Sequence, residues 1–421
     1  DRFGMVSICD FVAMEEMPLL PDGNVDLNAL SKPGSNGAHL ERNIVPPQNE
    51  LEEKLVKIWE KILNIHPISA EDNFFELGGS SLQAVRIFAK IEKTFEKKMS
   101  LATPFQAPTI RQLAEIIQDE GWTPAWSSLV AIQPEGSKPP FFCMAPLAST
   151  VLIFANLARQ LGKEQPFYGL EPLGLDGEKE PHDRVEDMAA HYIKEIRNFK
   201  PEGPYFVGGG CFGGTIAFEV AQQLVTSGEE VVLVILDTIW PPLTAEMIEN
   251  PPENYPFMAE RFEQIVSRNS LKYDFRGLLR MKLRELPRAF KMMIIKKFKP
   301  SYREERIERV TFTGNYKPAN IQHVMDAHYK ARLSYVTRVY PGRIILLQSP
   351  LGTKRESHLA WSELVSGGVD CHMVPGDHEL LYEAPNVKVV AAKLRACLEE
   401  AQAGVVQNKS GFNKEAISLD K

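Results

Sequence analysis

The sequence lacks any apolar run long enough to span a membrane, because no stretch approaches the roughly 18 uninterrupted apolar residues that a spanning helix needs. The start, Asp1 to Gly4, has no feature of a secretory signal peptide. The five cysteines lie far apart and form no C-x-x-C pair, which argues against both a zinc site and a disulfide framework. We therefore expect a cytoplasmic protein with neither a membrane nor a metal ion as partner.

The sequence also lacks a basic excess. Its formal net charge is −7, and the basic residues of the helical stretch 257–299 require no more than a solvated helix face. Nucleic acid is therefore a poor candidate partner. With 421 residues and 44% hydrophobic content, the chain is long and apolar enough for more than one folded core.

Composition divides the chain into segments. Residues 34–47 and 120–128 are rich in turn-forming and polar residues, as is typical of linkers. Between them, residues 48–119 show amphipathic helical patterns that predict an all-α bundle of three to four helices. A larger domain is expected over residues 129–402, followed by a flexible tail over residues 403–421.

The larger domain is predicted to have an α/β fold. Helical patterns separate several short apolar runs, each typical of a buried parallel strand, and the sites of such folds lie at the carboxyl ends of the strands. The alternation fails over residues 242–321, where we expect a helical lid. The apolar runs are residues 140–144, 205–207, 231–236 and 344–347.

The most informative stretch is residues 207–214, between an apolar run and a helical pattern. Here Gly209-x-Cys211-x-Gly213 has the form of the nucleophile elbow G-x-S-x-G, with cysteine in the place of serine. The glycines would let neighbouring backbones approach, and the helix dipole would favour a thiolate. The alternative is a glycine-rich turn that carries a buried, unreactive cysteine.

A nucleophile needs a base, and the base needs an orienting acid. Asp237 ends the apolar run 231–236, and His378 lies in a loop before the last helical pattern. The order nucleophile, acid, base is that of α/β-hydrolases. We predict His378 as general base and Asp237 as its acid, because Asp377 is too close in sequence to His378 and the run 344–347 is followed by no carboxylate.

The oxyanion hole is predicted from two backbone N–H groups. One belongs to Phe212, directly after the nucleophile, and the other lies near Leu147, in the loop after the first parallel strand. Six further histidines have no comparable loop context and are expected to be ordinary polar residues. They are His182, His191, His323, His328, His358 and His372.

Residues 72–82, which include Phe-Phe-Glu-Leu-Gly-Gly-Ser-Ser-Leu, resemble the attachment site of peptidyl carrier proteins. In that family a serine that matches Ser81 carries covalent 4′-phosphopantetheine. Ser80 stands where the family commonly has Asp or His, so which of the two serines is modified stays open. The alternative role for such a serine is a helix N-cap with no chemistry.

Residues 18–30 resemble the closing motif of nonribosomal peptide synthetase adenylation domains, with Asn24 in the place of the usual lysine. Residues 1–33 would then be an adenylation-domain remnant, 48–119 a four-helix carrier domain, and 129–402 a terminal type I thioesterase with the α/β-hydrolase fold and a helical lid. The resemblance implies partners: upstream condensation and adenylation domains, a phosphopantetheinyl transferase, and a peptidyl or acyl substrate.

The implied function is transfer of the acyl chain from Ser81 to Cys211, followed by release. Because a cysteine keeps the acyl group as a thioester, we hypothesise that intramolecular capture, giving a lactone, macrocycle or amide, is favoured over hydrolysis. Two alternatives stay open: a polyketide or fatty acyl thioesterase, and a non-catalytic module that binds acyl chains. The sequence also leaves open whether Cys211 is native or an engineered replacement of serine.

Overall fold

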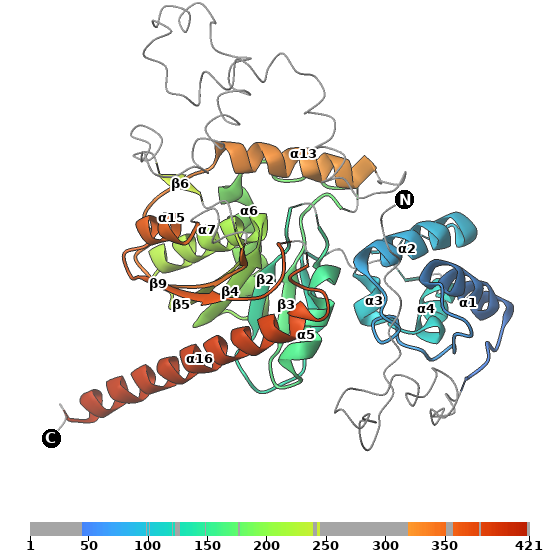
Figure 1. Cartoon of the computed structure of the whole chain (residues 1–421), viewed down its shortest axis with the longest axis horizontal. Coiled ribbons are helices and arrows are strands. Elements are labelled where there is room, and N and C mark those ends of the chain that lie inside the picture. Colours follow the sequence, from blue (N-terminus) through green and yellow to red (C-terminus); the bar gives the residue numbers. More distant parts are fainter. Residues whose placement is uncertain are drawn as a thin grey trace, which may run out of the picture.

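The structure is a computed structural model, and it describes most of the chain from residue 44 to residue 418 (Figure 1). The proposed adenylation-domain remnant, most of the first linker and nearly all of the proposed lid lie outside the described residues. The described ranges are 44–97, 99–100, 102–119, 121–122, 127–147, 149–175, 177–238, 242–244, 319–350, 357–378 and 380–418.

The first described unit is a bundle of helices. Three of its helices begin at side-chain caps: Asn49 accepts a hydrogen bond from the N–H of Glu52, and Ser80 and Thr109 each form a capping box. Their apolar faces meet in one core, as their spacing in the sequence predicts. The helices are α1 (Glu50–Leu63), α2 (Ser81–Phe95), α3 (Thr103–Gln106) and α4 (Ile110–Gln118).

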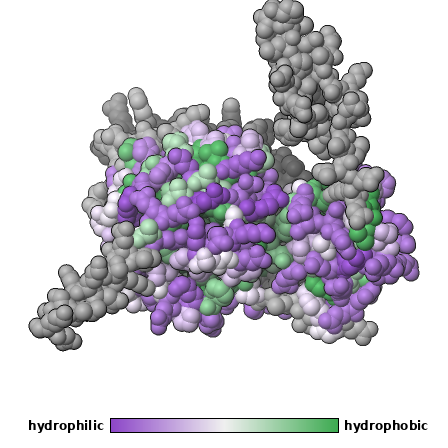
Figure 2. All heavy atoms as spheres, turned by 90° about the horizontal axis from the view of Figure 1, so that it is seen from below, coloured by the Kyte–Doolittle hydropathy of each residue, from purple (hydrophilic) through white to green (hydrophobic). Residues whose placement is uncertain are grey.

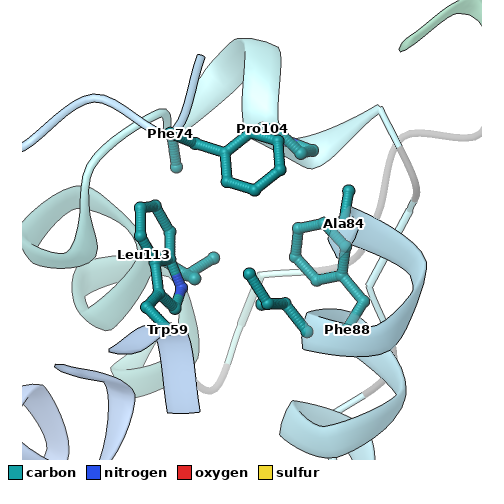
Figure 3. A pocket seen from close by; sticks show the side chains of 8 residues that line it. Trp59, Phe74, Ala84, Phe88, Pro104 and Leu113 are labelled. Atoms are coloured by element: carbon teal, nitrogen blue, oxygen red, sulfur yellow. The ribbon is translucent and has the colours of Figure 1, made fainter. Parts of the chain in front are cut away.

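Aromatic side chains fill the centre of this bundle. The rings of Trp59 and Phe74 meet edge to face with centroids 5.5 Å apart, and Phe74 also lies where a side chain on Gly79 would be. Figure 3 shows a small pocket among these side chains, with Trp59 and Leu113 on one side and Ala84 and Phe88 on the other. Its lining is apolar, so the pocket is part of the bundle's core.

The second unit is built on one twisted sheet with the order β1-β3-β2-β4-β5-β8-β9. Strand β1 is antiparallel to β3, and every other neighbouring pair is parallel. The strands are β1 (Leu129–Gln133), β2 (Phe141–Met144), β3 (Phe167–Leu170), β4 (Tyr205–Gly210), β5 (Val231–Leu236), β8 (Ile344–Gln348) and β9 (Val369–Met373).

Helices cover both faces of this sheet, and each layer has its own apolar core. On one face α6 (Val185–Phe199) packs against α7 (Phe212–Thr226). On the other face α5 (Ala155–Leu161), which follows the 3₁₀ turn η1 (Val151–Phe154), packs against α16 (Asn386–Ser418).

Smaller elements complete the second unit. The helices α13 (Ala319–Ser334) and α15 (Ser357–Leu364) add residues to the core on the α6 and α7 side. The short strands β6 (Leu243–Thr244) and β7 (Val336–Thr337) pair in parallel. Figure 2 shows that the face seen from below is largely hydrophilic, with scattered apolar patches. No described helix combines the length and apolar content needed to cross a bilayer.

Two expectations need correction. The sheet is not wholly parallel, because β1 adds an antiparallel edge strand whose alternating pattern is weak in the sequence. The tail predicted to be flexible from residue 403 belongs to α16, which continues to Ser418. No proline interrupts this stretch, so the backbone of α16 can continue beyond its buried part.

The packing of β4 against α7 predicts a difference between two glycine variants. A side chain on Gly209 would enter the backbone of Gly213, whereas one on Gly404 in α16 would meet nothing within 4 Å. We expect Gly209→Ala to cost about 1–3 kcal/mol of unfolding free energy, or roughly 2–10 °C in Tm. Gly404→Ala should leave Tm unchanged or slightly raised, since alanine favours helix. Equal Tm values in calorimetry would contradict this account.

Candidate active site

Cys211 lies at the turn between β4 and α7 and has φ 53° and ψ −123°. This conformation is strained for a residue with a side chain, so the surroundings must hold it. The N–H of Cys211 donates to the carbonyl of Leu236 (3.3 Å), and the hydroxyl of Thr238 donates to the carbonyl of Cys211 (2.7 Å). On the other side, Gly213 lies so close to the carbonyl of Met144 that no side chain fits there. The geometry is that of a nucleophile elbow.

Asp237, at the end of β5, is 1% exposed and accepts three hydrogen bonds. His378 Nδ1 lies 2.8 Å from Asp237 Oδ2. The N–H and the hydroxyl of Ser349, which follows β8, donate to the two carboxylate oxygens over 2.7 and 2.8 Å. A carboxylate held by this many donors orients the imidazole, with Nδ1 protonated and Nε2 directed away from the acid.

Electrostatics couple Cys211 to His378. Burial opposes ionisation of the thiol, yet the hydrogen bond and charge of His378, the charge of Arg332 and the N–H of Phe212 together lower the pKa of Cys211. Burial likewise opposes the charged imidazole, but hydrogen bonds to Asp237 and Cys211 raise the pKa of His378. Both shifts favour a thiolate beside an imidazolium, and the two groups titrate as a pair.

Helix α13 contributes two groups that the sequence did not reveal. The ring of His328 lies 5.3 Å from the ring of Phe212, and burial lowers the pKa of His328 to about 4, so it is neutral at physiological pH. Arg332, one turn further along α13, is half-buried and brings positive charge to the thiol. The sequence carried no signal for either, because α13 lies more than 100 residues after Cys211.

The loop expected to complete the oxyanion hole runs from the end of β2 to η1. Leu147 is half-buried in it, and the N–H of Phe212 reaches the thiolate position from the start of α7. Residues at the end of β3 hold both ends of the loop: the N–H of Ala145 donates to the carbonyl of Leu170 (3.1 Å), and that of Val151 to Glu171 Oε1 (3.3 Å). Burial raises the pKa of Glu171 to about 7.

The remaining candidates lie apart from this constellation. Asp377 is exposed, and His378 pairs with Asp237 instead. His372 pairs with Asp370 over 3.2 Å, and His323 with Glu180 over 2.7 Å. The structure therefore brings together Cys211, His378 and Asp237 from three distant parts of the chain, with Ser349, Thr238 and Arg332 as additional neighbours. Ser349 and Thr238 follow strand ends, which is the one sequence signal that pointed toward them.

The thioesterase domain family matches residues 139–398, more than half of the 421 residues. The chain belongs to the thioesterase domain family. A second family, the phosphopantetheine attachment site, matches residues 53–117, so the helical bundle is a domain for covalent phosphopantetheine. The thioesterase has the α/β-hydrolase type of fold, which confirms the expected multi-domain layout of a helical domain followed by an α/β domain.

Several synthetases are similar in sequence. A dimodular nonribosomal peptide synthase of Bacillus subtilis is 34% identical over 249 residues, which are 59% of this chain and 10% of that protein. Malpinin synthetase of Mortierella alpina is 37% identical over 54% of this chain and 3% of its own length. Chondramide synthase of Chondromyces crocatus is 28% identical over 93% of this chain and 10% of its own. The chain spans 3–10% of the length of these relatives.

Solved structures are more distant. A four-domain nonribosomal peptide synthetase bound to AMP and glycine is similar over 90% of this chain and 28% of its own, with 24% identity and a TM-score of 0.46. The NocB thioesterase domain is similar over 65% of this chain and 99% of its own, with 20% identity and a TM-score of 0.43.

The coupling of thiol and imidazole predicts the pH dependence of alkylation. Iodoacetamide should modify Cys211 at pH values below the usual thiol midpoint of about 8.5, since the pKa of Cys211 is lowered. In His378→Ala the burial remains while the hydrogen bond and charge are lost, so the midpoint should move to higher pH. Mass spectrometry of the Cys211 peptide across a pH series measures this.

The matched control is Cys371 on β9, whose pKa burial raises. Its alkylation should require high pH and should not change in His378→Ala. A Cys211 midpoint that is the same with and without the imidazole would contradict the pairing.

Proposed function

We propose that this chain is the carrier and terminal thioesterase part of a nonribosomal peptide synthetase. The observation that carries the proposal is the meeting of Cys211, His378 and Asp237 at the carboxyl edge of the sheet, in a chain that also holds a phosphopantetheine attachment domain. Similarity to several peptide synthetases supports the substrate class.

The proposed chemistry has two steps. In the first, the Cys211 thiolate attacks the carbonyl of an acyl or peptidyl thioester presented by the carrier domain, and a new carbon–sulfur bond forms. As the old carbon–sulfur bond breaks, His378 gives its Nε2 proton to the leaving thiolate. In the second step His378 takes a proton from the incoming nucleophile, the acyl–Cys211 bond breaks, and the thiolate is restored. Asp237 stabilises the imidazolium, and the N–H groups at Phe212 and Leu147 would stabilise each oxyanion.

A cysteine nucleophile affects which group accepts the acyl chain, water or a nucleophile within the chain itself. An acyl group on Cys211 remains a thioester, which is more activated than the oxyester that a serine would form. We therefore propose that release occurs by intramolecular capture, giving a lactone, macrocycle or amide, in preference to hydrolysis. The helical lid proposed for residues 242–321 would exclude water from the acyl chain, as lids of this kind do in other enzymes.

Ser81 is the proposed attachment residue, at the first helical position of α2. The neighbouring Ser80 caps this helix: its side chain accepts from the N–H of Gln83 (3.3 Å), and the Gln83 side chain accepts from the N–H of Ser80 (2.9 Å). A hydroxyl engaged in a capping box is not available for modification without loss of the cap. This supports Ser81 over Ser80. When bound, phosphopantetheine supplies a flexible arm that ends in a thiol.

Modification of the carrier domain provides the first test. A phosphopantetheinyl transferase with coenzyme A should add one phosphopantetheinyl group, seen as a mass increase of the intact chain. We expect Ser81→Ala to abolish the increase. Ser80→Ala is the matched variant: it should be modified, while losing about 0.5–2 kcal/mol of stability with its cap. The reverse pattern would assign the attachment to Ser80.

Release provides the second test. With a peptidyl group loaded on the carrier domain, the wild-type chain should pass through an acyl–Cys211 species visible by intact mass. Cys211→Ala should form none. In Cys211→Ser, formation and breakdown should slow by at least about tenfold, and the ratio of cyclised to hydrolysed product should fall.

Two outcomes would contradict the proposal. Equal rates and equal products in Cys211→Ser would remove the argument for capture. Equal release in Cys211→Ala would mean that the α/β domain binds acyl chains without covalent catalysis, which is the alternative function.

A further inference from the structure

The carrier domain contacts the thioesterase domain at the 3₁₀ turn η1 and at α5, and Figure 1 shows α3 and α5 on facing sides of the two domains. Leu152 of η1 is 4% exposed and belongs to the apolar core of the carrier domain. In return, Ala102 of the carrier domain is 6% exposed and belongs to a core of the thioesterase domain, against which Phe105 also packs. The two cores are therefore continuous across the junction.

Polar and aromatic contacts also fix the orientation of the loop at this junction. The rings of Phe75 and Phe105 are stacked with centroids 4.9 Å apart and 17° between their planes. Arg159 Nη1 of α5 donates to the carbonyl of Phe75 over 3.3 Å, and Asn156 holds the same guanidinium through Nη2 over 3.1 Å. A guanidinium fixed at two points selects one orientation of the loop that carries Phe75.

Both sides of the junction adjoin the reacting groups in sequence. On the carrier side, Phe75 lies in the loop that leads directly to Ser81 at the start of α2. On the thioesterase side, η1 follows the loop of Leu147, the proposed second oxyanion donor. The contact thus joins the segment before the attachment residue to the segment after the oxyanion loop.

We propose that this junction, made by Phe75, Ala102 and Phe105 of the carrier domain with Leu152 and Arg159 of the thioesterase domain, is the docking surface used for acyl transfer to Cys211. Its partner is the carrier domain of the same chain, and the inference rests on the proposed function. The alternative is a contact that only holds the carrier domain between turnovers and must break before transfer. Weakening a docking contact should slow acyl transfer, whereas weakening a storage contact should leave it unchanged or make it faster.

Two variants weaken the junction from opposite sides. Arg159→Glu removes the exposed guanidinium that holds the Phe75 loop, and Phe105→Ala removes the ring shared by both cores. Lys163→Glu is the matched control for charge, because Lys163 is an exposed cation shortly after α5. In the full chain with a loaded carrier domain, the rate of acyl–Cys211 formation should fall by about three- to tenfold in each junction variant and stay unchanged in the control.

Hydrolysis of a small soluble thioester distinguishes an effect on docking from an effect on the chemistry at Cys211. This hydrolysis needs no carrier domain, so both junction variants should hydrolyse the thioester at the wild-type rate. Modification of each variant by the phosphopantetheinyl transferase checks that the carrier domain has folded. Transfer that is unchanged or faster in both variants would overturn the docking role. Failure of the wild-type chain itself to form acyl–Cys211 or to hydrolyse the small thioester would instead overturn the proposed function.

Discussion

The structure depends on one strained backbone turn at Cys211. A side chain at φ 53° is tolerated only when surrounding contacts hold the turn more strongly than its strain opposes it. Here those contacts come from three directions: the N–H of Cys211 bonds to the end of β5, its carbonyl accepts from Thr238, and the glycines beside it let α7 approach β4 and the end of β2. The strain places sulfur at the start of a helix, where the dipole favours negative charge.

A second constraint follows, because a thiolate in a half-buried position needs a compensating cation. His378 supplies it, and a buried carboxylate with three donors supports the imidazolium in turn. Ser349, directly after β8, donates its hydroxyl to Asp237, the acid that follows β5. This division of roles between two neighbouring strand ends makes Ser349 a positioning residue for Asp237.

The two domains are joined by side-chain contacts as well as by a linker. Apolar side chains from each enter the core of the other, and an arginine on α5 holds the backbone of the loop before Ser81. The contact involves Leu152 of η1, the turn that follows the loop proposed to complete the oxyanion hole.

Much of this was predictable from local pattern. The apolar runs predicted β4, β5 and β8, and the glycine spacing predicted the turn around Cys211, because strands and tight turns are encoded by neighbouring residues. The order nucleophile, acid, base along the chain indicated Asp237 as the candidate acid and His378 as the candidate base. The antiparallel edge strand β1 and the continuation of α16 to Ser418 were not predicted, since pairing direction and helix extension have weak local signals.

By itself, the sequence determined the candidates for the proposed chemistry and their order along the chain: a thiol in a glycine turn, an acid after a strand, and an imidazole in a late loop. Only the tertiary structure decided that Ser349, Thr238 and Arg332 surround them and that Phe105 and Leu152 join the two domains. The physical reason is distance along the chain. These contacts join segments that come together only when the sheet and its helices pack. Local periodicity in the sequence does not predict such long-range contacts.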